Sequence, residues 1–126
     1  MSRETEIKNA RIQGTMLGTE DHGIFTCTVT LDYGGSGQSF GGYGLDQPIH
    51  RGGKFVCRQG TAWGMEFIKR VLKAIGAGKW EDLPGTHCRV MADYGKVHAI
   101  GHIIKDQWFD PVKDLAHLLG EEKADE

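Results

Sequence analysis

The residues of this 126-residue chain best suited to chemistry are six histidines and three cysteines. His98 and His102 share one face of an expected strand, but four residues of extended chain separate them by ~13 Å, too far for one metal ion. The Cys-x-x-Cys and His-Glu-x-x-His spacings of metal sites do not occur in the sequence. The sequence therefore predicts no metal and no cofactor, and we expect histidines that are solvated or hydrogen-bonded.

Nucleophilic and acid–base groups give equally weak signals. Cys27 and Cys88 fall on apolar strand faces, where a thiol is normally inert packing, whereas Cys57 lies in a more open, polar connection. The acidic turn Glu20–His22 can position a water molecule, but a capped turn explains the same residues. We therefore do not expect an enzyme, and a hydrolase using this turn is the remaining catalytic alternative.

Composition and charge limit the class of protein. Apolar residues make up 39% and charged residues 25% of the chain, which is ordinary for a globular protein. The net charge of −2 gives no strong field for a long polyanion, although a local basic patch remains possible. Three widely spaced cysteines indicate free thiols, and the polar start Met1–Glu6 and the lack of a long apolar run indicate neither a signal peptide nor a membrane span. We expect a cytoplasmic protein.

The Gly-rich hairpin Asp32–Tyr43 is the first candidate for contact with a partner. Its free backbone N–H groups can cradle an anion, but no Gly-Lys-Ser/Thr enters a helix, and a strand follows the glycines. Phosphate-loop and dinucleotide patterns are thus excluded. Aromatic residues among glycines make good contact anchors, although glycines required only for turn geometry are the alternative. The predicted partner-binding residues are Tyr33, Gly35, Gln38, Phe40 and Tyr43.

Two groups of basic residues give a nucleic-acid alternative. Aromatic side chains on the strands of a small barrel would resemble the stacking platforms of proteins that bind single strands. The overall charge argues against tight binding. The residues of this alternative site are Arg51, Lys54 and Arg58 in one connection and Lys69, Arg70 and Lys73 in one helix.

Hydrophobic periodicity predicts the elements that must position these residues. Apolar residues alternate with threonines from Phe25 to Leu31, which indicates a half-buried strand. Met65, Ile68 and Leu72 recur at helical spacing after a Thr61 N-cap. Further strands are expected at 7–15, 39–45, 88–92 and 97–104, a polar connection with a short strand at 54–57, and a last helix at 112–119.

The predicted fold class is α+β. The order of strands and helices lacks the alternation of a parallel βαβ sheet. We expect a mainly antiparallel sheet or a small open barrel packed against one main helix, with a short C-terminal helix. Residues 1–120 are expected to form a single domain, and residues 121–126 a charged, disordered tail.

Several sequence blocks together resemble a family of small proteins carried by phages, prophages and other mobile elements. The resemblance covers roughly residues 7–111 and supplies no catalytic residues. The blocks are Glu20–Ile24, Leu31–Gln38, Phe40–Tyr43, Gly60–Phe67, Lys79–Gly85, Val97–His102 and Trp108–Pro111.

The resemblance implies a function by context. It favours a non-enzymatic protein that binds a host defence protein or ribonucleoprotein complex in the bacterial cytoplasm and inhibits it, with an anti-CRISPR protein as the specific hypothesis. The alternative is a single-stranded nucleic-acid or nucleotide-binding accessory protein of phage DNA metabolism. Under the first hypothesis, replacing Tyr33, Phe40 and Tyr43 together is expected to abolish inhibition and leave the fold intact.

Overall fold

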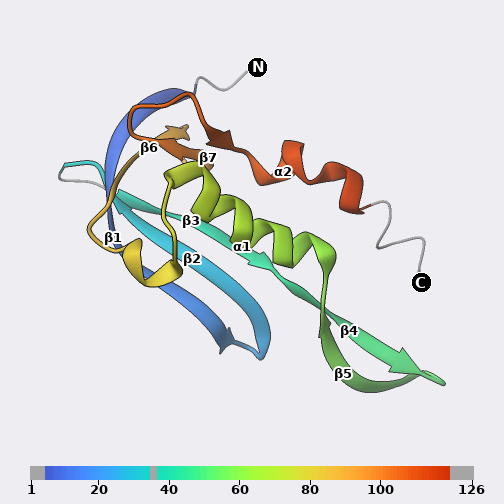
Figure 1. Cartoon of the computed structure of the whole chain (residues 1–126). Helices are drawn as coiled ribbons and strands as arrows, with labels where there is room; N and C mark the ends of the chain where they lie inside the picture. The colour runs from blue at the N-terminus through green and yellow to red at the C-terminus, as the bar shows by residue number, and fades with distance from the viewer. Residues whose placement is uncertain (1–4, 35–36, 120–126) are drawn as a thin grey trace.

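The computed structural model describes residues 5–34 and 37–119. A six-stranded antiparallel sheet has the order β3-β2-β1-β6-β7-β8 and is covered by one main helix, which confirms the predicted α+β class (Figure 1). Gly35 and the predicted tail at 121–126 lie outside the described residues. The strands of this sheet are β1 (Glu6–Asp21), β2 (Ile24–Asp32), β3 (Gly37–Gly44), β6 (His87–Ala92), β7 (Val97–His102) and β8 (Trp108–Phe109).

The long strand β1 makes the sheet curl. Its first part pairs with β6, as far as Arg11 opposite His87, and its second part pairs with β2. The register shifts between Ile12 and Gly14, and such an irregularity bends a strand and increases its twist. The sheet therefore curls but stays open. Across the open side β3 and β7 run parallel, and the Gln38 Nε2 group donates to the Tyr94 carbonyl at 3.2 Å.

Helix α1 (Ala62–Ile75) packs its aromatic side against the sheet. The Thr61 Oγ1 atom accepts from the Gly64 N–H at the N-cap, and Gly76 ends the helix with a φ of 88°, as the sequence predicts. Inside, the ring of Phe67 lies 5.7 Å from that of Phe40 and 5.5 Å from that of Phe109, measured between centroids. These three rings fill the centre of the core.

The buried face of α1 departs from the predicted one at Met65, whereas Ile68 and Leu72 pack against the core as expected. Trp63, Phe67 and Val71 are buried, whereas Met65 is 60% exposed. The start of the helix lies close to the preceding chain, since a Cβ added at Gly64 would lie 2.2 Å from the carbonyl oxygen of Leu45. Only glycine permits this approach, because a side chain here would overlap backbone atoms.

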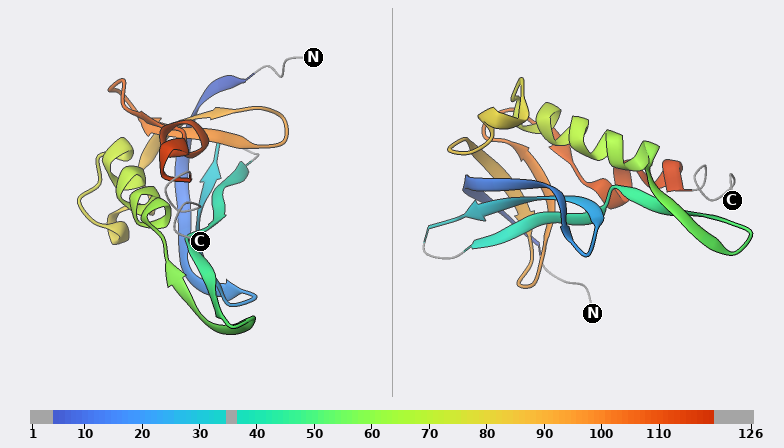
Figure 2. Two further views of the ribbon diagram at one scale, coloured as in Figure 1. Left: turned by 90° about the vertical axis from the view of Figure 1, so that its right-hand side faces the viewer. Right: turned by 90° about the horizontal axis from the view of Figure 1, so that it is seen from below.

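Residues 46–60 form a second, two-stranded sheet rather than a polar connection with one short strand. Strand β4 (Asp46–Arg51) pairs with β5 (Lys54–Gly60) through a tight turn at Gly52 and Gly53, whose φ values are 57° and 77°. This hairpin, called the arm below, extends beyond the body of the molecule in every view (Figures 1 and 2).

Short helices complete the chain. A 3-10 turn, η1 (Trp80–Asp82), follows α1, and the Trp80 Nε1 group donates to the Thr15 hydroxyl on β1. Helix α2 (Pro111–Asp114) begins after Asp110, whose side chain accepts from the Lys113 N–H. The predicted C-terminal helix is thus present.

The contact between Gly64 and Leu45 predicts an unusual response to alanine. In an exposed helix interior, Gly→Ala stabilises by about 1 kcal/mol. Gly64→Ala should instead lower the free energy of unfolding by about 1–3 kcal/mol, because the new methyl group meets backbone. Urea unfolding followed by circular dichroism measures this. Gly78→Ala, where a Cβ would meet nothing within 4 Å, is the matched control and should change little. Equal effects of the two variants would contradict the prediction.

Candidate functional site

Phe40, a predicted partner contact, is a core residue. It is 0% exposed and its ring stacks on that of Phe67. Strand β3 directs this side chain inward, beneath α1, so no partner can reach it in this fold. The prediction for Phe40 is therefore corrected, and the triple replacement of Tyr33, Phe40 and Tyr43 would disturb the core rather than leave the fold intact.

The other residues of the Gly-rich hairpin are partly covered. The Tyr43 ring packs against Trp63, with 5.4 Å between centroids. The Tyr33 ring has the Lys8 Nζ atom 5.5 Å from its centroid, and burial raises the pKa of the Tyr33 hydroxyl. Gln38 is held by its bond to Tyr94, and Gly35 lies outside the described residues. These residues do not form a cluster of exposed aromatic anchors.

Arg58, expected to contact nucleic acid, is held at the base of the arm. Its Nε and Nη2 atoms both lie 2.9 Å from the Asp46 Oδ1 atom, and the side chain of Asp46 is only 9% exposed. The hydrogen bond from Arg58 is the largest influence on Asp46 and holds the pKa of its carboxyl below the usual value. Arg58 therefore supports the base of the arm. Two nitrogens of its guanidinium already bind Asp46, which leaves this residue less suited to contact a phosphate.

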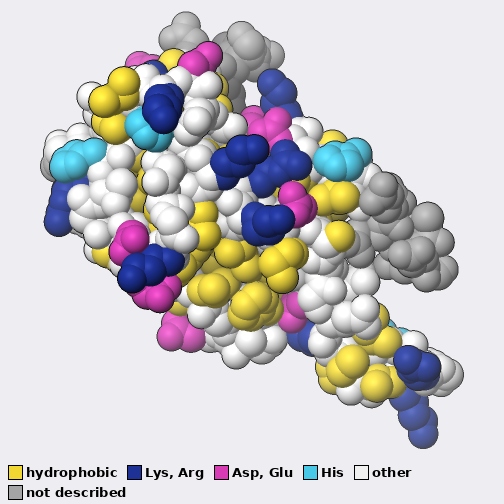
Figure 3. All heavy atoms as spheres, in the orientation of Figure 1, with side chains coloured by type: hydrophobic (Ala, Val, Ile, Leu, Met, Phe, Trp, Pro, Cys, Tyr) yellow, Lys and Arg dark blue, Asp and Glu magenta, His cyan; other side chains and the backbone are white. Residues whose placement is uncertain are grey.

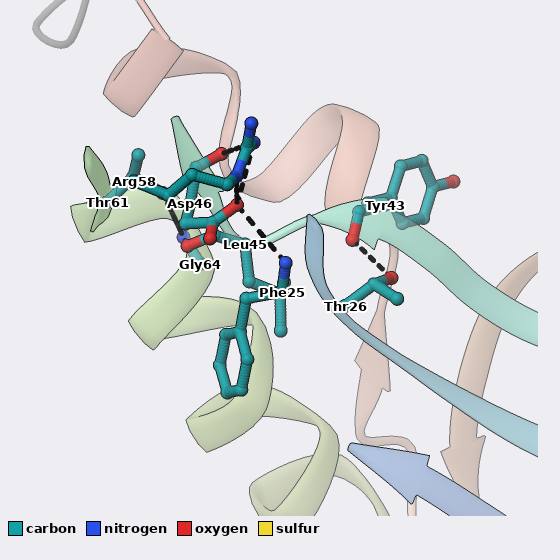
Figure 4. A network of polar contacts seen from close by, with 8 residues as sticks. All are labelled: Phe25, Thr26, Tyr43, Leu45, Asp46, Arg58, Thr61 and Gly64. Atoms are coloured by element: carbon teal, nitrogen blue, oxygen red, sulfur yellow. Dashed lines mark hydrogen bonds and ion pairs between the residues drawn. The ribbon is translucent and has the colours of Figure 1, made fainter. Parts of the chain in front are cut away.

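A network of polar contacts joins the arm to the body around this ion pair (Figure 4). The Asp46 Oδ1 atom also accepts from the Phe25 N–H at 3.3 Å, which connects β4 to β2. The carbonyl of Leu45 accepts from the Thr61 N–H and from the Thr61 hydroxyl. Because Thr61 is also the N-cap of α1, the same residues fix the direction of both the arm and the helix.

The surface of the arm combines cations with exposed apolar side chains. Arg51 and Lys54 face each other at its exposed tip. Phe55 is 60% and Val56 is 51% exposed, and the ring of His50 meets that of Phe55 edge-on at 6.0 Å. The arm therefore exposes two large apolar side chains close to its cations.

Charge is distributed unevenly between the arm and the rest of the chain. The arm, residues 46–60, contains three basic residues and one acidic residue, Asp46, so it carries +2, while the whole chain carries −2. The remaining residues therefore carry −4. The arm is thus a local cationic element on a chain of slightly negative overall charge.

The basic residues of α1 lie on the same side of the molecule as the arm tip. Lys69 and Lys73 are exposed and Arg70 is half-buried. Figure 3 shows Lys and Arg side chains gathered over α1 and again at the tip of the arm, with hydrophobic side chains between them. Of the six predicted basic residues, Lys69, Arg70 and Lys73 therefore lie together on α1, Arg51 and Lys54 lie together at the arm tip, and Arg58 is paired with Asp46.

Two of the six histidines, His98 and His102, have structural hydrogen bonds. The His98 Nε2 atom lies 2.7 Å from the Asp93 carboxylate, and the His102 Nδ1 atom accepts from the N–H groups of Ile104 and Lys105. Among residues 5–34 and 37–119, no group of three or more His, Cys, Asp or Glu side chains is placed to hold a metal ion. In the turn Glu20–His22, the His22 side chain is 92% exposed and contacts its neighbour Asp21 at 2.7 Å.

The thiols follow the predicted pattern. Cys27 and Cys88 are buried, and burial raises the pKa of each to about 12. Neither is a thiolate at neutral pH, so both are poor nucleophiles. Cys57 is exposed on the arm.

Comparison of the chain with family models, with curated proteins and with solved structures finds no match. Within the described part of the chain, no helix is both long enough and apolar enough to span a membrane. Function must therefore be inferred from the geometry of the chain's own residues.

The Asp46–Arg58 pair predicts a pH-dependent contribution to stability. The pKa of Asp46 is lower in the folded than in the unfolded protein, so its contribution is present above the unfolded value of about 4 and is lost as pH falls through the folded value. Asp46→Asn should lower the free energy of unfolding by about 1–3 kcal/mol at pH 7 and by clearly less at pH 3.

Urea unfolding of both proteins at the two pH values tests this. Glu6→Gln, which removes an exposed carboxylate 3.7 Å from the Lys8 Nζ atom, is the control and should have little effect at either pH. A destabilisation by Asp46→Asn that does not depend on pH would show that the charge of Asp46 is unimportant.

Proposed function

We propose that this protein is a non-enzymatic binding module for single-stranded nucleic acid, which it contacts through the arm. The observation that carries the proposal is the arm itself, a projecting hairpin with a cationic tip at Arg51 and Lys54 and an exposed ring at Phe55. Proteins that bind single strands combine two elements: cations that neutralise phosphates, and aromatic rings on which bases stack.

The connectivity of the main sheet also supports a nucleic-acid-binding module. Five strands in the order β3-β2-β1-β6-β7 form a curled, open sheet, and the helix α1 lies between the third and fourth of them in the chain. This is the connectivity of the OB-fold, a partly open five-stranded barrel that binds oligonucleotides in many other proteins. The likeness is an analogy at the level of fold and supports the class of ligand, whereas the site is argued from the arm.

An exposed aromatic ring favours a single strand over a duplex. The bases of a single strand can unstack and place their faces on Phe55, whereas those of a duplex are stacked on one another. Stacking of this kind contributes about 1–3 kcal/mol per base, and each phosphate neutralised on a single strand adds about 0.7 to the slope of log affinity against log salt. With two exposed cations at the arm tip, Arg51 and Lys54, we expect moderate affinity that falls as salt rises.

The arm predicts which residues binding depends on. Arg51→Glu combined with Lys54→Glu should weaken binding of a fluorescein-labelled oligothymidylate by at least about tenfold at low salt, and Phe55→Ala should weaken it by about tenfold. Fluorescence anisotropy measures both. Neither change touches the core, because all three side chains are exposed.

Lys79→Glu combined with Lys113→Glu is the matched control. It reverses the same amount of charge at two exposed positions outside the arm and should cost less than the arm variant. Absence of binding by the wild-type protein at low salt, or equal losses in the two variants, would contradict the proposal. Preference for a duplex of the same length would contradict the single-strand assignment.

The inhibition of a bacterial defence system remains a prediction. The origin in a phage or prophage, the anti-CRISPR activity, the cytoplasmic location and the host target all depend on the sequence resemblance alone. The basic tip of the arm is also compatible with the nucleic acid of a ribonucleoprotein complex, which connects that hypothesis with the proposal made here.

A further inference from the structure

A groove of about 630 Å³ lies between α1 and the segment that contains β8 and α2. One wall is α1, with Lys69, Arg70 and Lys73, and the opposite wall includes Asp106, Gln107, Trp108 and Asp114. With Glu66 on the α1 wall, the groove has three cations and three carboxylates, so the positive charge is confined to the α1 side. Its volume lies within the range of sites that hold small ligands or pieces of larger ones.

Cations predominate on the α1 wall. Glu66 is the only carboxylate there, and it lies 3.7 Å from the Lys69 Nζ atom and 3.4 Å from the Arg70 Nε atom. Lys73, one turn beyond Lys69, has no ion pair within the described residues. Three cations against one carboxylate leave this wall positive, which suits a phosphate backbone.

The opposite wall offers groups suited to bases. The Trp108 ring covers Gly101, where an added Cβ would lie 2.7 Å from ring atoms, and it lies 5.0 Å from the guanidinium of Arg89. Asp106 accepts from the Trp108 Nε1 group at 3.1 Å, which fixes the ring further. A held indole, a carboxylate and the Gln107 amide are the kinds of group that stack on bases and bond their edges.

We propose that this groove is a second segment of the binding surface, which holds the same single strand beyond the arm. Lys69, Arg70 and Lys73 would contact the sugar–phosphate backbone, and the wall with Trp108 would face the bases. The inference rests on the proposed function. Its support is the separation of charge across the groove and the gathering of Lys and Arg side chains over α1 on the face that also shows the arm tip (Figure 3).

The proposal predicts that binding depends on strand length. Oligothymidylates from 4 to about 25 nucleotides, a range that spans known single-strand site sizes, should bind the wild-type protein with increasing affinity until they reach both the arm and the groove. Lys69→Gln combined with Lys73→Gln should weaken the longest strands by about tenfold, lower the salt slope by about 1.4, and leave the shortest strands unaffected.

Lysine acetylation followed by mass spectrometry tests the unmodified protein. The longest strand should protect Lys69, Lys73 and Lys54 from acetylation, and the shortest should protect Lys54 alone. Lys79 is the internal control, because it is exposed and outside both surfaces.

The outcomes separate this inference from the proposed function. If the arm variant loses binding while the groove variant keeps the wild-type length dependence and Lys69 and Lys73 stay reactive, the groove is not part of the site and the function stands. If no single strand binds at low salt, both fail. Loss of binding to long strands only, together with protection of Lys69 and Lys73, supports the groove.

Discussion

The ion pair between Asp46 and Arg58 is the constraint on which the arrangement of the arm depends. A two-stranded hairpin is marginally stable in water by itself, and the arm has little core of its own, because most of its side chains are exposed. The pair closes the base of the hairpin, and Asp46 also accepts from Phe25 on the neighbouring strand. The nearly buried carboxylate of Asp46 therefore connects the two strands of the arm with each other and with strand β2 of the main sheet.

The close approach of Gly64 to Leu45 sets the helix relative to the same junction. It lets α1 pack closely with Trp63 and Phe67 on its buried side, and Lys69 and Lys73 lie on the exposed side. Because the arm and α1 both start from this junction, its contacts set the direction of both elements.

Overall charge is a poor guide to this protein. The net value of −2 averages a cationic hairpin with a more negative remainder, and fields at short range depend on where the charges lie. The formal charge also does not show that Arg58 is paired with Asp46. The exposed positive charge of the arm therefore comes from Arg51 and Lys54. A polyanion would contact two cations at the arm tip, Arg51 and Lys54, and three basic residues on α1. Hydrophobic side chains lie between the two groups (Figure 3).

The sequence by itself determined the features that depend on neighbours in the chain. The alternation in Phe25–Leu31, the N-cap at Thr61 and the glycine at 76 predict a strand and a helix correctly, because those signals act within a few residues. The hairpin of the arm was not predicted, because polar and apolar residues do not alternate regularly along its strands. Its strands are held instead by cross-strand pairing and by an ion pair between residues twelve positions apart. Only the tertiary structure decided that Phe40 is core rather than contact surface, since its direction depends on how the sheet curls beneath α1. It likewise decided which cations are free, because pairing is set by distance in space and not by position in the sequence.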